Sequence, residues 1–322
     1  MNHEVDLKSK CHSPAEDPSI ERTLLRDAEA AFAPTGEPGK VTKAEPIEVR
    51  PDMTVAEAVE AIVQSCIHHF RSNAVIVARR REVAALHQMR VSMRRLRAAL
   101  SLFRPALADP QFENLRDELR WFTGQLGEAR NLDVFLMQKG IPKPLRSLLK
   151  TERGNAYDHV IETLQSKRLR LLLIDLIAWV ELGRWRRNPK ACRPLSDFVA
   201  RRLYKWWQKI ARHGDLEAIH ANERHELRIE IKKLRYALDF LQPLHMNAGR
   251  KQKQFYKSVE GLQESLGKLN DVVTARALWR KYGHKLPRSK SQEQEIEEKY
   301  LRSAQASLDR IRKTGPYWTR LA

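Results

Sequence analysis

The segment that decides the fold is HQMRVSMRRLRAAL, residues 87–100, because it occurs a second time as HELRIEIKKLRYAL, residues 225–238. A second pair of matching segments follows, with FTGQLGEARN at residues 122–131 and LQESLGKLND at residues 262–271. An internal repeat constrains the architecture, because each copy is expected to form the same supersecondary unit. The two halves of the chain are therefore predicted to be copies of one unit.

Apolar residues recur at spacings of three and four nearly throughout the chain beyond residue 54, which is typical of amphipathic helices. No segment shows the two-residue alternation of a half-buried strand. Each half supplies about four helices, and four helices with short connections pack as an antiparallel bundle. We therefore predict an all-α, internally duplicated fold, in which two antiparallel four-helix bundles are related by a pseudo-two-fold axis.

The first 60 residues differ in composition from the rest, with 13 acidic residues, 7 basic residues and several prolines. Such a segment has too little apolar surface to fold alone. Residues 1–50 are therefore predicted to be a disordered leader, and residues 51–322 a helical domain. Within that domain we expect a first half over about 52–168, a connector over about 169–190 and a second half over about 191–322.

The chain of 322 residues carries 59 Lys and Arg against 40 Asp and Glu, a formal net charge of +19. Since the first 60 residues are acidic, the cationic excess belongs to the helical domain, which indicates an anionic partner. No apolar stretch approaches the roughly 20 residues of a membrane span. The amino terminus lacks the pattern of a signal peptide, so the cytoplasm is the expected location.

Each copy of the repeat carries a cationic row beside an apolar stripe, when residues are placed at about 100° intervals around a helix. The first row is His87, Arg90, Arg94 and Arg97, and the second is His225, Arg228, Lys232 and Arg235. At the rim of the rows we expect Arg95 and Lys233. Residues 87–108 contain no Asp or Glu, and the acids Glu226 and Glu230 lie off the face of the second row.

An arginine row is ordinarily a solvated face with acids in pairing positions, but neighbouring like charges repel when no acid is present. A row kept in both copies therefore points to an external polyanion. Inorganic polyphosphate, nucleic acid, and anionic lipid or acidic protein all fit two cationic rows. Arginine forks suit phosphate oxygens, and a protonated histidine donates from both ring nitrogens.

Other chemistries find little support in the sequence. The two histidines lack neighbours in ligand spacing and the three cysteines are far apart, so no metal site is predicted. No phosphate loop, nucleophile elbow or paired-carboxylate constellation occurs, so neither a cofactor nor an enzymatic activity is expected. Tryptophans among basic residues, at Trp185 and at Trp206 and Trp207, leave a nucleic-acid-binding helical protein as the alternative.

At these residues the sequence resembles the CHAD family, the conserved histidine α-helical domain, whose signature is similar to H-x-x-R-V-x-x-R-R-L-R-x-x-L-x-x-F. The matching residues are His87, Arg90, Val91, Arg94, Arg95, Leu96, Arg97, Leu100 and Phe103. The resemblance extends from about residue 52 to the carboxyl terminus. The second copy matches more loosely, with Lys232 and Lys233 in place of two arginines and Leu241 in place of the phenylalanine.

This resemblance implies two four-helix bundles with a basic groove between them, non-catalytic binding of inorganic polyphosphate, and a location at polyphosphate granules. Many members of the family follow a CYTH triphosphatase domain, which we do not expect here. The CYTH motif E-x-E-x-K does occur at residues 295–299, but in a charged helical stretch rather than on a strand. We therefore expect polyphosphate to be held by the two rows, with nucleic acid as a competitor.

Overall fold

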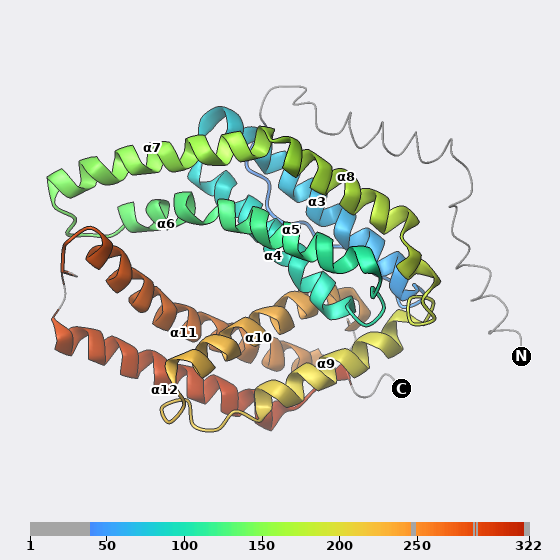
Figure 1. Ribbon diagram of the computed structural model, residues 1–322. Helices are drawn as coiled ribbons and strands as arrows, with labels where there is room; N and C mark the ends of the chain where they lie inside the picture. The colour runs from blue at the N-terminus through green and yellow to red at the C-terminus, as the bar shows by residue number, and fades with distance from the viewer. Residues whose placement is uncertain (1–38, 246–248, 286, 288, 319–322) are drawn as a thin grey trace, which may run out of the picture. The chain divides into compact units, whose positions relative to one another are not determined.

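The computed structural model describes residues 39–245, 249–285, 287 and 289–318 (Figure 1). In these residues the regular secondary structure is helical, and a single β-bridge joins Thr54 to Pro194. The all-α prediction is thereby confirmed. The chain divides into two compact units, the first ending at Leu195 and the second beginning at Ser196. The internal duplication stays a prediction.

The first unit is built from six described α-helices and one short 3-10 helix. They are α3 (Val55–Arg80), α4 (Val83–Phe103), α5 (Pro110–Gln125), α6 (Gly127–Leu136), α7 (Lys143–Gln165), α8 (Lys167–Leu182) and η1 (Arg184–Arg187). Helix α3 packs along α4, and α6 packs along α7. Only Leu126 separates α5 from α6, and only Ser166 separates α7 from α8, so each pair forms one interrupted helical rod. Figure 1 shows α6 following α5, and α8 following α7.

The helices of the first unit begin where the sequence supplies capping groups. Helix α3 starts with a capping box, in which Thr54 accepts from the backbone of Glu57 and the Glu57 carboxylate accepts from the backbone of Thr54. Helix α5 is capped at its N-terminus by Asp109, whose Oδ1 accepts from the backbone N–H groups of Gln111 and Phe112. The other oxygen of Asp109 accepts from Nε1 of Trp179 at 2.8 Å. Asp109 therefore both caps α5 and ties it to α8.

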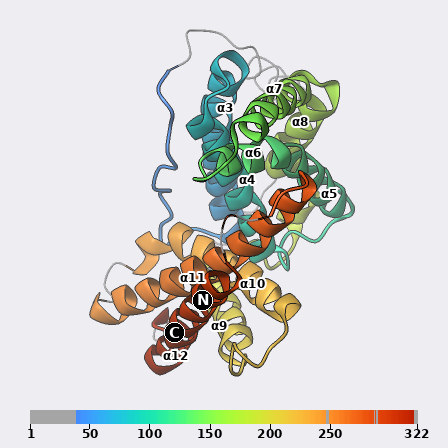
Figure 2. The ribbon, with the colours of Figure 1, turned by 90° about the vertical axis from the view of Figure 1, so that its left-hand side faces the viewer.

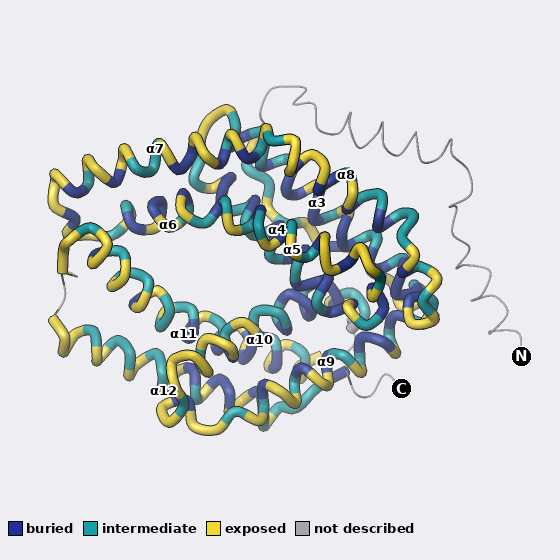
Figure 3. The backbone as a smooth tube through the Cα atoms, in the orientation of Figure 1, coloured by how far each residue is buried: buried dark blue, intermediate teal, exposed yellow. Residues whose placement is uncertain are grey.

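Helix α7 shows how the apolar spacing is used. Its buried residues recur at helical spacing from Leu145 to Thr163, and Figure 3 shows buried and exposed positions alternating along it. The segment 169–190, which the sequence predicts as a connector, forms most of α8 together with η1. Helix α8 buries Leu172, Leu176 and Trp179 and packs against α5, α7 and α3. It is therefore a structural part of the first unit.

Residues 39–53 form no helix or strand, and Thr42 among them contacts α3. Ile47 and Val49 are buried, and the fully buried Asn73 donates from Nδ2 to the carbonyl of Thr42 at 3.0 Å. Nε2 of His69 contacts the same carbonyl at 3.0 Å. The predicted disordered leader, residues 1–50, thus includes a stretch that packs on α3, while residues 1–38 lie outside the described residues.

The second unit contains four described α-helices and a short 3-10 helix. They are α9 (Leu195–Ala211), α10 (Ala221–Phe240), η2 (Gln242–His245), α11 (Gly249–Lys281) and α12 (Lys290–Thr314). Helices α11 and α12 form a long hairpin, and α10 packs against α11 (Figures 1 and 2). Helix α11 runs without interruption through Gly267, where the matching segment of the first unit is broken beside Gly127.

Among the described helices, none combines the length and the apolar composition that crossing a membrane requires.

Candidate functional site

The cationic row predicted on the first repeat lies on α4. We call it the α4 row, and its members are His87, Arg90, Arg94 and Arg97. Helix α4 buries Met89, Met93 and Leu96 completely against the rest of the unit. The α4 row occupies the neighbouring face, and all four of its side chains are half-buried. The predicted arrangement of an apolar stripe beside a cationic stripe is therefore what α4 shows.

No carboxylate in the described part of the chain forms an ion pair with the α4 row. Arg90 is held by an uncharged group, since its Nη1 donates to the backbone carbonyl of Thr123 at 3.3 Å. Nε of Arg94 is buried without a hydrogen-bond partner. The cationic charge of the row is thus partly withdrawn from water and is not compensated by acids.

The interruption between α5 and α6 explains the contact of Arg90. In an unbroken α-helix the carbonyl of residue 123 would accept from the N–H group of residue 127. Because α5 ends at Gln125 and α6 begins at Gly127, the carbonyl of Thr123 is available to a side chain. A Cβ atom at Gly127 would lie 4.0 Å from Nη1 of Arg90, so the junction approaches this guanidinium closely.

Electrostatic coupling identifies three further arginines beside the α4 row. Burial, followed by the charges of Arg130, Arg94 and Arg90, lowers the pKa of His87 below its ordinary value. Burial, with Arg94 and Arg130, lowers the pKa of Arg90 to about 10. Burial, with Arg120 and Arg116 of α5, also lowers the pKa of Arg97.

The site predicted from the sequence does not include Arg116, Arg120 or Arg130. Of these three, Arg130 lies in the second repeated segment, residues 122–131, so the repeat could have identified it as a candidate site residue.

Arg95, predicted at the rim of the row, faces another part of the first unit. Its residue surface is only 8% exposed, and its charge acts on Cys66 and His69 of α3. Burial raises the pKa of the Cys66 thiol, and Arg95 opposes that shift. The structure therefore places Arg95 in the packing between α4 and α3, away from the α4 row.

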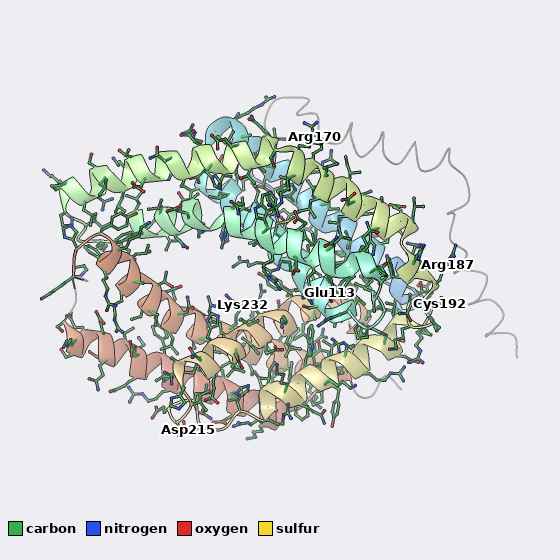
Figure 4. All side chains as sticks on the ribbon, viewed as in Figure 1. Glu113, Arg170, Arg187, Cys192, Asp215 and Lys232 are labelled. Atoms are coloured by element: carbon green, nitrogen blue, oxygen red, sulfur yellow. The ribbon has the colours of Figure 1, made fainter. Side chains whose placement is uncertain are left out.

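The second predicted row lies on α10 and comprises His225, Arg228, Lys232 and Arg235, which we call the α10 row. His225 is exposed, whereas the other three side chains are half-buried. Figure 4 labels Lys232 on this helix. The predicted rim residue Lys233 donates to Glu230 at 3.2 Å, and Lys209 of α9 donates to the same carboxylate at 3.0 Å.

Arg235 at the end of the α10 row is compensated by an acid. Its Nη1 lies 3.1 Å from Oδ2 of Asp239, and its Nε donates to Oε1 of Gln263 at 2.6 Å. The hydroxyl of Tyr256 donates to the other oxygen of Asp239. Burial would lower the pKa of Arg235, but Asp239 and the neighbouring tyrosines outweigh it, so the pKa is raised. The α10 row is therefore partly neutralised within its own unit.

The described residues contain no group of three or more His, Cys, Asp or Glu side chains placed to hold a metal ion. The E-x-E-x-K segment, residues 295–299, lies within α12, so it is helical as predicted. Glu297 pairs with Arg276 of α11 at 3.1 Å, and Glu293 pairs with the same arginine at 2.6 Å. These carboxylates hold α12 against α11.

Comparisons with known proteins agree with this architecture. A family model described as the CHAD domain matches residues 61–280. The crystal structure of the CHAD domain from the plant Ricinus communis is similar with a TM-score of 0.66 and 29% identity, covering 85% of this chain and 96% of that one. PptA from Streptomyces chartreusis shares the fold, with a TM-score of 0.55 and 16% identity over 81% of this chain and 99% of that one. No curated protein matches.

Proposed function

Because this chain belongs to the CHAD domain family, we propose that it binds inorganic polyphosphate without catalysing a reaction on it. CHAD domains are associated with polyphosphate, and the domain alone is not a catalytic family. The observation that carries the proposal is the α4 row, a set of half-buried cations without a compensating carboxylate in the described residues.

The energetics of the α4 row favour a ligand with closely spaced negative charges. Burial and mutual repulsion both raise the free energy of the row, as the lowered pKa values of His87 and Arg90 indicate. A phosphate chain supplies acceptor oxygens at short intervals, and guanidinium groups bind such oxygens with forked, charge-assisted hydrogen bonds. Binding therefore removes the repulsion that the unliganded protein carries.

The α10 row is proposed as a weaker region of contact, since Asp239 already neutralises its Arg235 and Glu230 engages the neighbouring Lys233. Three further features are proposals as well. They are a basic groove between two bundles, a location at polyphosphate granules and the absence of catalysis. The supporting observation for each of them is the family relationship.

The nucleic-acid alternative depended on exposed aromatic rings. Trp185 is buried, and its Nε1 donates to the carbonyl of Trp179 at 2.7 Å. Trp206 is also buried, with 9% of its surface exposed. Because a stacking platform needs an exposed ring face, these two tryptophans favour a structural role. A competition assay decides: polyphosphate should displace RNA at far lower phosphate concentration than RNA displaces polyphosphate.

The test of the proposed function is equilibrium binding of long-chain polyphosphate to the full chain. The double variant R90E/R94E should lose binding, while its helical content in circular dichroism stays unchanged. The matched control is K143E/K150E, which changes the charge equally at two exposed positions on α7. Equal losses in both variants would mean that total charge, rather than the α4 row, determines binding.

A further inference from the structure

Two arginines of α5, Arg116 and Arg120, act electrostatically on Arg97 near the end of α4, where Glu113 joins Arg116 to Arg104; we call them the α5 pair. They are four residues apart on one helix, so they share a face. Each is held by an acid three residues earlier, Arg116 by Glu113 and Arg120 by Asp117, at 2.8 Å in both cases. The α5 pair is thus oriented by local contacts.

The order of contacts shows that the rod formed by α5 and α6 runs antiparallel to α4. Arg130 of α6 couples to His87, the backbone at Thr123 contacts Arg90, and the α5 pair couples to Arg97. At 1.5 Å per residue, His87 and Arg97 are about 15 Å apart along α4. Basic side chains therefore line the junction of α4 with the rod of α5 and α6 over the whole of this length.

The acids near the α5 pair leave an excess of positive charge. Glu113 is shared, because it pairs with Arg104 at 3.1 Å as well as with Arg116. Asp117 and Arg120 are both well exposed, and exposed pairs of this kind gain little free energy. Nε of Arg116 is buried without a hydrogen-bond partner. A guanidinium has five N–H donors, so an arginine held by one carboxylate still has donors for a phosphate.

We propose that the polyphosphate site continues from the α4 row onto α5, where Arg97 and the α5 pair bind further phosphates of the same chain. This inference rests on the proposed function and adds a preference for length. A chain long enough to reach both ends of the row contacts the α5 pair. Triphosphate, with three phosphoryl groups, is too short to occupy the His87 end and the α5 pair together.

The experiment compares long-chain polyphosphate with triphosphate as ligands of the full chain. In R116Q/R120Q, the affinity for long chains should fall by about tenfold, as expected for two charge-assisted contacts at a partly exposed site. The affinity for triphosphate should change by less than about twofold, because its phosphates bind at the more deeply buried cations of the α4 row. K143Q/K150Q on α7 is the matched control, and thermal unfolding checks that each variant is folded.

Two results would overturn the extension onto α5. One is an unchanged long-chain affinity in R116Q/R120Q, and the other is an equal loss for both ligands, which would reflect general electrostatics. Failure of the proposed function looks different, since wild-type protein would then bind no polyphosphate, or R90Q/R94Q would bind it as tightly as wild type.

Discussion

The α4 row and the α10 row come from matching segments of sequence, yet their surroundings differ in charge. Arg97 ends the α4 row beside two more arginines, Arg116 and Arg120. Arg235 ends the α10 row in contact with Asp239. The pKa of Arg97 is lowered, chiefly by burial, whereas that of Arg235 is raised because Asp239 outweighs burial. One row therefore keeps its charge available, and the other uses it to hold its own unit together.

The difference extends to the helices that flank the rows. The offset of 140 residues between the second repeated segments places Tyr256 and Glu260 where the first copy has Arg116 and Arg120. It also places Asn270 where the first copy has Arg130. At these matched positions the second unit therefore carries no cation. Similar sequence in one helix does not ensure similar chemistry, because the neighbouring helices determine whether a cation is compensated.

The largest expected effect is a difference between the two rows in how much each contributes to polyphosphate affinity. R90Q/R94Q should weaken polyphosphate binding by about 100-fold, since each lost charge-assisted contact at a half-buried site costs on the order of tenfold. R228Q/K232Q should weaken it by less than about tenfold, because the α10 row, whose Arg235 is already paired with Asp239, is proposed as the weaker region of contact. Isothermal titration calorimetry measures both affinities. Equal losses would show that the two rows contribute alike and would remove the distinction.

The next effect is a difference between the rows in how much their last arginines contribute to the free energy of unfolding. R235Q should lower the free energy of unfolding by about 1–2 kcal/mol, because the half-buried Asp239 loses its ion pair with Arg235 and Gln263 loses its hydrogen bond. R97Q should leave it nearly unchanged, since it removes a repulsive contact with the α5 pair. Urea unfolding of both variants provides the measurement. A larger loss of unfolding free energy in R97Q than in R235Q would contradict the conclusion that Arg235 stabilises its unit and Arg97 does not.

A smaller effect concerns pH. Since burial and three arginines lower the pKa of His87, the folded, unliganded protein binds a proton there less readily than the unfolded chain. Stability should therefore decrease as pH falls through the ordinary histidine range near 6.5. A bound polyanion favours the protonated ring, so polyphosphate affinity should rise over the same range, by at most about tenfold per pH unit for one proton.

The pH dependence can be assigned by substitution. H87Q should reduce the rise in affinity between pH 8 and pH 5.5, whereas H225Q, at an exposed position of α10, should retain it. Titrations in buffers of different ionisation enthalpy report proton uptake directly. The same uptake in wild type and H87Q would assign the linkage to another group.

The smallest expected effect is on salt dependence. Each phosphate contact contributes about 0.7 to the slope of log affinity against log salt, by analogy with single-stranded nucleic acid. R90Q/R94Q should therefore reduce the slope by about 1.4, and K143Q/K150Q should leave it close to the wild-type value. Binding measured across a series of salt concentrations tests this, and a wild-type slope near zero would contradict electrostatic binding altogether.

The sequence predicted the helical fold and the face of the α4 row, because both follow from spacing within one helix. Met89, Met93 and Leu96 are buried as the stripe indicated. Asp239 was also within reach of sequence reasoning, since it stands four residues after Arg235, a standard pairing distance. The acids weighed from the sequence were Glu226 and Glu230, and the pairing of Arg235 with Asp239 was missed.

Other features depend on packing that helical periodicity does not contain. Arg130, Arg116 and Arg120 reach the α4 row because the rod of α5 and α6 runs antiparallel to α4. Arg95 follows Arg94 directly, yet the 100° turn between them directs it to α3. The attachment of Thr42 to α3 depends on single contacts, such as that with Asn73, rather than on composition.

The contact between Arg90 and the carbonyl of Thr123 has a consequence for how a protein can prepare an anion site. A carboxylate at that place would fix the guanidinium but would cancel its charge and compete with the ligand. A peptide carbonyl fixes it with a dipole that has no net charge. The interruption after Gln125 thus lets the protein separate two tasks that an acidic partner combines, the orientation of a cation and its neutralisation.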